Sequence, residues 1–407
     1  MVTPPRRSPV AVHVVWRSGG LEADQLARAV FTHLTADPSQ PNARSLGIPV
    51  RYWSSGGSAD VPADLRRRDR NDRAAFGRDV HADRPDGRGA QWAIDVPPPV
   101  DLSRAERNVV VLLIDNGLVS AGWRDYLAEL LRAVGAGPGN WLLPFALTPN
   151  FARIPVVADV DVVDLHTMPA HLREQVFLNQ VVHRVCRQIS VADPVRVFIS
   201  YASGDGGEIA REVARHLRLE TDVDDFLDAH HIAGGDPFAD ILDATATGCA
   251  MLAVNSDSYS SRLWCQREFL SAKRASMPVV VLDAITDRSV RAFPYLGNVP
   301  TIRWHSDSRT VLDRLVGVLL TETLRHRYFP LRAAEMCGKH GVTLPSLLLV
   351  RPPELLTLLD LPRHSARSSS SVDLLYPDPP LGTEESRLLE KLDDSLRAVT
   401  PTMLFST

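Results

Sequence analysis

Glu268 follows an apolar run and a serine-rich turn, an arrangement that could present a carboxylate to a ligand. The apolar run Met251-Leu252-Ala253-Val254 is typical of a buried parallel strand. Residues 258–261 end that strand, and residues 267–274 have the pattern of a helix. Open α/β sheets bind ligands outside the carboxyl ends of their strands, so a carboxylate at this corner is a candidate catalytic group. A glutamate near a helix start is also favoured by the helix dipole alone, which leaves a purely structural role open.

Strands and helices alternate on both sides of this corner. The predicted strands are residues 195–201, 223–227, 251–254, 278–282 and 301–304. After the first strand, Ile209, Val213 and Leu217 are spaced four residues apart, which predicts an amphipathic helix. This alternation predicts a doubly wound parallel sheet.

The segment from about Val195 to Arg325 resembles a TIR (Toll/interleukin-1 receptor) domain, in particular the bacterial type that consumes NAD+. Four pieces carry the resemblance: the strand and turn at residues 198–205, the strand end Phe226-Leu227-Asp228, the loop Gly235-Asp236-Pro237-Phe238, and the corner Ser258-x-x-Ser261-x-x-Trp264-Cys265-x-x-Glu268. Each piece is weak alone, but their order over about 130 residues makes the resemblance specific.

The resemblance implies either an enzyme or an adaptor, and Glu268 favours the enzyme. Enzymatic TIR domains break the bond between nicotinamide and ribose in NAD+. Nicotinamide in NAD+ already carries positive charge and leaves without a general acid. One carboxylate can therefore suffice, by stabilising an oxocarbenium-like transition state or by trapping it covalently. NAD+ is then the substrate, no cofactor is required, and no metal site is indicated.

The resemblance also implies a set of substrate-binding residues around Glu268. Tyr201, Ser203 and Asp205 would line the mouth of the site. Phe226, Tyr259 and Trp264 are candidates to pack around or stack on a ring, with a core role equally open for Phe226 and Trp264. The remaining candidates are Asp228, Ser256 and Cys265. Cysteine at such a position is more often a small buried hydrophobe than a nucleophile.

The loop that follows the second strand of this segment is a candidate regulatory element. The residues concerned are Gly234, Gly235, Asp236 and Pro237. The family resemblance implies a loop that moves or docks on a neighbouring protomer, whereas the glycines alone could simply shape a turn. The adjacent His230-His231 pair does not predict a metal site, because neighbouring side chains point in different directions on a regular element.

Residues 1–190 show a similar order of elements. The predicted strands lie at residues 12–16, 48–53, 108–114, 141–147 and 160–165, and a closing helix at residues 169–189. Trp123 follows the third strand much as Trp264 does later, but Leu127 stands four residues beyond it where Glu268 stands in the second unit. This pattern predicts a degenerate TIR-like copy at about residues 10–190 that has lost the carboxylate and acts as a scaffold or regulator. An unrelated α/β domain would show the same alternation.

Two other regions carry weaker signals. The Arg/Asp-rich run at residues 66–73 could bind nucleic acid, but its interleaved aspartates and sparse aromatics favour a solvated loop. Residues 326–407 predict a small α/β region with a strand at 374–376, a helix at 383–396 and a last strand at 402–405. The acidic residues Asp378, Glu384 and Glu385 lie at the start of that helix, where the helix dipole already favours them.

Composition limits the other function classes. The 407 residues are 44% hydrophobic with a net charge of −4, which is ordinary for a globular protein and argues against general polyanion binding. The four cysteines are scattered and predict neither a disulfide framework nor a zinc site. No apolar run is long enough to span a membrane, and the first residues do not resemble a signal peptide. These features predict a cytoplasmic protein.

The sequence therefore predicts two flavodoxin-like doubly wound parallel-sheet domains in tandem (1–190 and 191–325) plus a small C-terminal α/β region (326–407). The predicted activity is NAD+ glycohydrolysis, in an antiphage effector activated by self-association through TIR domains or by an unidentified ligand or partner. No nucleic acid and no membrane are expected as partners. The alternatives are a non-enzymatic TIR scaffold or adaptor, and an enzyme that cyclises ADP-ribose or exchanges its base.

Overall fold

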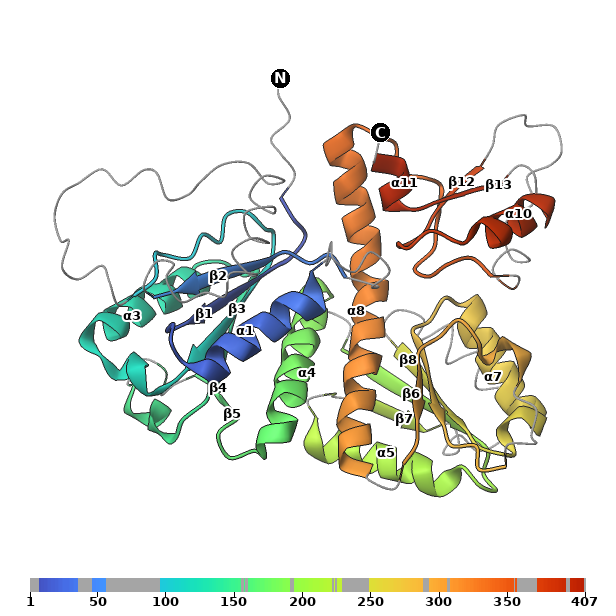
Figure 1. Ribbon diagram of the computed structural model, residues 1–407, viewed down its shortest axis with the longest axis horizontal. Helices are drawn as coiled ribbons and strands as arrows, with labels where there is room; N and C mark the ends of the chain where they lie inside the picture. The colour runs from blue at the N-terminus through green and yellow to red at the C-terminus, as the bar shows by residue number, and fades with distance from the viewer. Residues whose placement is uncertain are drawn as a thin grey trace. The chain divides into compact units, whose positions relative to one another are not determined.

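The structure is a computed structural model of the chain (Figure 1). It describes residues 7–35, 46–55, 96–154, 157, 160–190, 194–221, 223, 225–228, 249–287, 293–305, 308–354, 356, 372–392 and 396–405. These residues form two compact units. One comprises Val10–Thr35 and Gly47–Val181, and the other consists mainly of Val182–Thr407. We call them the N-terminal unit and the C-terminal unit.

The N-terminal unit contains a five-stranded parallel sheet in the order β2-β1-β3-β4-β5. Its strands are β1 (Ala11–Trp16), β2 (Val50–Ser54), β3 (Asn108–Ile114), β4 (Asn140–Ala146) and β5 (Val163–Asp164). Every residue of β1 and β3 is buried, as expected for apolar strands covered on both faces.

Helices cover both faces of this sheet. Helix α3 (Ala121–Gly135) packs through Trp123 and Leu127 on Val110 and Leu112 of β3. Helices α1 (Leu21–Leu34) and α4 (Ala170–Ile189) are linked to each other by an ion pair between Glu22 and Arg173 (2.8 Å). The amphipathic spacing of these helices explains why each turns one apolar face toward the sheet.

The C-terminal unit contains a second five-stranded parallel sheet, in the order β10-β9-β8-β6-β7. Its strands are β6 (Arg196–Tyr201), β7 (Asp225–Asp228), β8 (Cys249–Asn255), β9 (Val279–Asp283) and β10 (Thr301–Arg303). Numbered within each unit, both sheets have the order 2-1-3-4-5, which is the flavodoxin-like order. The predicted fold class is confirmed for both units.

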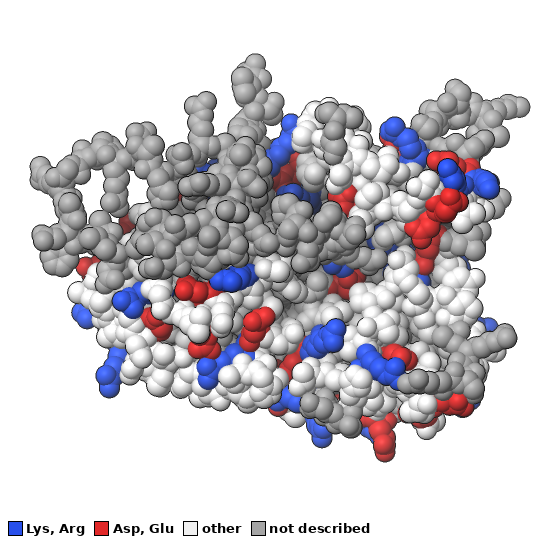
Figure 2. All heavy atoms as spheres, viewed as in Figure 1, with Lys and Arg blue, Asp and Glu red and all other residues white. Residues whose placement is uncertain are grey.

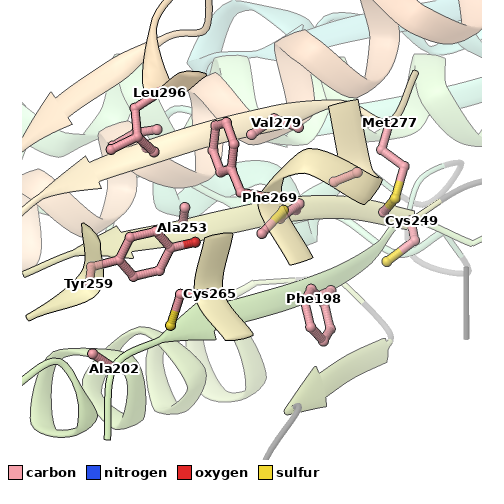
Figure 3. Close-up of a cluster of buried hydrophobic side chains, with 13 residues drawn as sticks. Phe198, Ala202, Cys249, Ala253, Tyr259, Cys265, Phe269, Met277, Val279 and Leu296 are labelled. Carbon is pink, nitrogen blue, oxygen red and sulfur yellow. The ribbon is translucent and has the colours of Figure 1, made fainter. Parts of the chain in front are cut away.

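Helix α7 (Leu263–Arg274) covers one face of the second sheet. Its inward residues join Phe198 and Met251 in a buried cluster, which is shown in Figure 3. On the other face lie α5 (Gly207–Glu220) and α8 (Ser308–His340), joined by a buried pair between His216 and Asp313 (3.1 Å). Helix α8 has 33 residues and runs without interruption through the predicted domain boundary near residue 325.

A small three-stranded parallel sheet completes the C-terminal unit. It has the order β11-β12-β13, with strands β11 (Leu347–Leu348), β12 (Val372–Leu375) and β13 (Leu396–Val399), and α10 (Thr383–Leu392) connects the last two. The predicted strand at 402–405 is wrong, because these residues belong to helix α11 (Pro401–Phe405). Pro401 occupies the first helical position, where proline is favoured, and the Thr400 hydroxyl accepts from the Met403 amide. The predicted helix at 383–396 ends at Leu392, and Leu396 already belongs to β13.

No helix in the described part of the chain has the length and hydropathy that crossing a membrane requires.

Candidate functional site

Glu268 lies in the second turn of α7 and points toward the sheet. The helix begins at Leu263, four residues before the predicted start, so Glu268 is not at the strand-to-helix corner as predicted. It shares the inward side of the helix with Cys265 and Ala272, which are three and four residues away, and with the adjacent Phe269. As a consequence only 3% of Glu268 is exposed.

A chain of hydrogen bonds holds the Glu268 carboxylate. Ser200 Oγ donates to Glu268 Oε2 at 2.5 Å, and the Tyr259 hydroxyl lies 2.9 Å from Ser200 Oγ. Ser200 has a single hydroxyl proton, so Tyr259 must donate to Ser200 when Glu268 is ionised. All three groups are buried, and they come from β6, the turn after β8 and α7.

Burial raises the pKa of Glu268 to about 7, and side-chain hydrogen bonds from Ser200 and Trp264 act in the opposite direction. The group therefore changes charge near neutral pH. In its ionised form it is a carboxylate with little solvation, which gains strongly from an approaching positive charge. A titratable group with this combination of burial and specific partners is a candidate functional residue.

A second carboxylate joins the turns after the first and third strands of this sheet. Asp205 accepts from Ser256 Oγ (2.6 Å) and from the Ser258 amide (2.8 Å). Burial alone would raise the pKa of Asp205, but these hydrogen bonds hold it below its usual value. The two turns follow the carboxyl ends of β6 and β8, which are neighbours in the sheet. Asp205 therefore holds these two turns together at the edge of the sheet near Ser200 and Glu268.

Residues 197–316 match the TIR domain family, as a single continuous segment. This segment is a TIR domain. The match does not include residues 10–190, so a TIR origin of the N-terminal unit is not confirmed, and only its fold class is established. No curated protein matches the chain.

The structure brings together several of the residues that were predicted to form the site of the TIR domain. Trp264 and Tyr259 lie around Glu268, and Ser256 is paired with Asp205. Ser203 is exposed at the carboxyl end of β6, and Tyr201 is half-buried there. Their roles in binding substrate stay predictions.

Three of the predicted contact residues differ in exposure. Tyr259 and Cys265 lie in the core cluster with Phe198 and Phe269, so here their side chains pack against protein (Figure 3). Burial raises the pKa of the Cys265 thiol to about 12, which keeps it protonated. Trp264 is 44% exposed, and of the three aromatic candidates it is the one described with a surface that could meet a ligand ring.

The other predicted residues lie partly or wholly outside the described residues. For Phe226 and Asp228 the structure describes only the backbone of β7. The loop with Gly234, Gly235, Asp236 and Pro237 lies outside the described residues, as do His230 and His231.

Sequence reasoning missed Ser200, the direct partner of Glu268. A signal was present, because side chains alternate between the two faces of a strand. Phe198 and Ser200 lie on one face of β6, and Val197 and Ile199 lie on the other. A serine on the buried face of a parallel strand needs a polar partner, and the inward face of the helix that packs there offers Glu268.

The described residues of the TIR domain and of the rest of the chain include no group of three or more His, Cys, Asp or Glu side chains that could hold a metal ion. On the face shown in Figure 2, basic and acidic side chains of the described residues are intermixed and form no extended patch of one sign. That face gives no support to nucleic-acid binding.

Proposed function

We propose that the TIR domain cleaves the bond between nicotinamide and ribose in NAD+, with Glu268 as the catalytic carboxylate. The observation that carries the proposal is the buried Glu268, with a pKa raised to about 7 by burial and with hydrogen bonds from Ser200 and Trp264. A poorly solvated anion of this kind favours a transition state in which positive charge develops next to it.

The proposed reaction requires few groups from the protein. The bond between ribose C1′ and the nicotinamide nitrogen breaks, and its electron pair neutralises the pyridinium. Glu268 stabilises the oxocarbenium-like sugar that remains. Water then attacks C1′ and loses a proton, which gives ADP-ribose. If a hydroxyl or a ring nitrogen attacks in place of water, the same site performs cyclisation or base exchange.

Glu268 must become accessible before it can contact a ribose. With 3% exposure it is closed off in this conformation, and the neighbouring Trp264 is the partly exposed residue bonded to it. TIR domains commonly self-associate, and we propose that assembly shifts Trp264 and opens the site. The protein should then show low activity when dilute. Full turnover by a monomer in a concentration series would contradict this step.

A scaffold without enzymatic activity is the second candidate. The hydrogen bonds of Glu268 could serve only to join α7 to β6, and the exposed Leu263 and Trp264 at the start of α7 could serve as a contact surface. The pKa near neutrality favours the enzyme, because a purely structural role does not require a carboxyl group that is hard to ionise.

The test is NAD+ consumption by the full chain at high protein concentration, with and without a crowding agent. We compare the wild type with Glu268→Gln, which keeps the shape, and with Glu208→Gln, which removes an exposed carboxylate from α5. Nicotinamide release by the wild type and by Glu208→Gln, but not by Glu268→Gln, supports the proposal. Equal release by all three rejects the assignment of Glu268, and chromatography of the products separates hydrolysis from cyclisation.

The cellular role that we propose is that of an antiviral defence effector, since a bacterium whose NAD+ is exhausted cannot support a phage. Expression of the wild type should arrest growth and lower cellular NAD+, whereas Glu268→Gln should do neither. Growth arrest by both forms would argue against this role.

A further inference from the structure

A hollow of about 440 Å³, including its open mouth, lies between the TIR sheet and the small C-terminal sheet. It is lined by Val279, Asn298, Val299, Pro300, Glu322, Arg325, Val350, Arg351, Pro352, Pro377 and Asp378. Val279 is the first residue of β9, so the hollow lies at the amino edge of the TIR sheet. Ser200 is near the carboxyl end of β6, and the hollow is therefore separate from the Glu268 site.

The position of the hollow relative to the small sheet is that of a ligand site. Residues 350–352 follow β11, and residues 377–378 follow β12. These two strands are parallel neighbours, so the hollow lies outside the carboxyl ends of adjacent strands. Ligands of open α/β sheets bind at this kind of edge.

Arg351 gives the hollow its chemistry. Its guanidinium is largely buried, and burial lowers its pKa below the usual value. Its Nη2 donates to the carbonyl oxygen of Lys273 (3.1 Å), and no carboxylate among the described residues forms an ion pair with it. The nearby Glu354 and Glu322 carboxylates act in the opposite direction on this pKa, but neither pairs directly with the guanidinium, so an anion bound to it would stabilise its charge further.

The nearby carboxylates are already engaged. Glu322 pairs with Arg325, and Glu354 pairs with Lys273 Nζ at 2.8 Å. Asp378 accepts from the Thr402 amide (3.3 Å). Among the described residues that line the hollow, Arg351 is thus the cation that has no directly paired carboxylate.

We propose that the hollow binds a small ligand through an oxyanion group, a phosphate or a carboxylate, with Arg351 as the main partner. Five N–H donors in a fixed plane suit arginine to this role, and the bond to the Lys273 carbonyl uses only one of the two terminal nitrogens.

The site is linked to the helix that carries Glu268. Lys273 belongs to α7, its carbonyl accepts from Arg351, and its Nζ donates to the Gly297 carbonyl oxygen (2.8 Å). An anion that fixes Arg351 would also hold the last turn of α7. The binding proposal does not depend on the proposed function, whereas an effect on nicotinamide release would.

Isothermal titration of the full chain with inorganic phosphate and with acetate, at constant ionic strength against chloride, tests the site and distinguishes the two anions. At least one anion should bind saturably, and Arg351→Gln should weaken it at least about tenfold, as expected for loss of a charge-assisted hydrogen bond. Arg387→Gln on α10, which removes an exposed arginine, should bind like the wild type. Absence of saturable binding by the wild type, or equal weakening in both variants, overturns the proposal.

Hydrogen exchange on the wild type keeps the test decisive if Arg351→Gln does not fold. The bound anion should slow exchange at the amides of Val350, Arg351 and Glu354 and in the last turn of α7, around residues 271–275. Protection elsewhere, or none, would place any bound anion outside this hollow and overturn the proposal. Neither measurement uses NAD+, so failure of the proposed function would not affect its outcome.

Discussion

The two five-stranded sheets have the same strand order. They differ in the side-chain contact that joins the first strand to the helix after the third strand. In the TIR domain the fifth residue of β6 is Ser200, and it is bonded to Glu268 of α7. In the N-terminal unit the fifth residue of β1 is Val15, and it packs with Trp123 and Leu127 of α3. One fold therefore holds a polar pair in one unit and an apolar contact in the other.

The two tryptophans that were predicted to correspond, Trp123 and Trp264, differ in exposure. Trp264 is the second residue of α7 and 44% exposed, whereas Trp123 is the third residue of α3 and fully buried. Counted from the helix starts, Trp123 corresponds to the buried Cys265, and Glu268 corresponds to Tyr126. Counted from the ends of β3 and β8, Glu268 corresponds to Leu127, and by either count the N-terminal unit lacks the carboxylate. The shared fold does not carry the chemistry, which depends on a few side chains.

The largest expected effect is the loss of nicotinamide release in Glu268→Gln. Removing one preorganised electrostatic group from an active site costs about 10³-fold in rate, and the N-terminal unit has no carboxylate at the matching position to replace it. Product formation measured by chromatography should fall by that factor. If half of the activity remained, the chemistry would have to reside elsewhere, and the contrast between the two units would lose its functional meaning.

The reverse exchange, which introduces a carboxylate into the N-terminal unit, should destabilise that unit. Leu127→Glu places a carboxylate among Val15, Trp123 and Leu130, where no serine is available to bond it. Burying such a group without a partner should cost about 3–5 kcal/mol in the free energy of unfolding. Urea denaturation followed by tryptophan fluorescence measures this loss. Glu268→Leu in the TIR domain is the matched control, and it should cost less, because it removes a carboxyl group that is costly to bury and Ser200 keeps its hydrogen bond with Tyr259.

A third prediction concerns the pH dependence of stability. The pKa of Glu268 is about 7 in the folded protein and about 4.5 when unfolded, so the folded state binds the extra proton between these values. The free energy of unfolding should therefore fall as pH rises from about 4.5 to 7, by on the order of 3 kcal/mol. Glu268→Gln lacks this contribution, and its stability relative to the wild type should rise by most of that amount between pH 5 and pH 8. Parallel denaturation curves for the two proteins over this range would show that the pKa is not raised.

These contrasts also show which features could be predicted from sequence. The apolar runs and their spacing were enough for both sheets, because a parallel strand covered on two faces must be apolar throughout. The Ser200–Glu268 pair joins residues 68 positions apart, and no local pattern determines which helical residue meets a given strand residue. The strand predicted at 402–405 failed because composition alone does not distinguish a short apolar strand from a single helical turn that starts at Pro401. The hollow beside Arg351 could not be predicted either, since its walls come from five separate segments.

The smallest expected effect is that of Ser200→Ala. This change removes the hydroxyl from β6, so that the strand has an apolar side chain at this position, as the N-terminal unit has with Val15. The hydrogen bond from Ser200 lowers the pKa of Glu268, so its loss should raise that pKa and leave less carboxylate at pH 7. A hydrogen bond to a charged group is worth about 1.5–3 kcal/mol, so nicotinamide release at pH 7 should fall about tenfold or somewhat more. The pH profile distinguishes this effect from simple damage to the fold, because activity should recover as pH rises toward 9, where Glu268 is ionised again. Ser200→Thr, which keeps the hydroxyl, should retain most of the activity at pH 7. A uniform loss at every pH in both variants would mean that Ser200 supports the packing of β6 against α7 and does not tune Glu268.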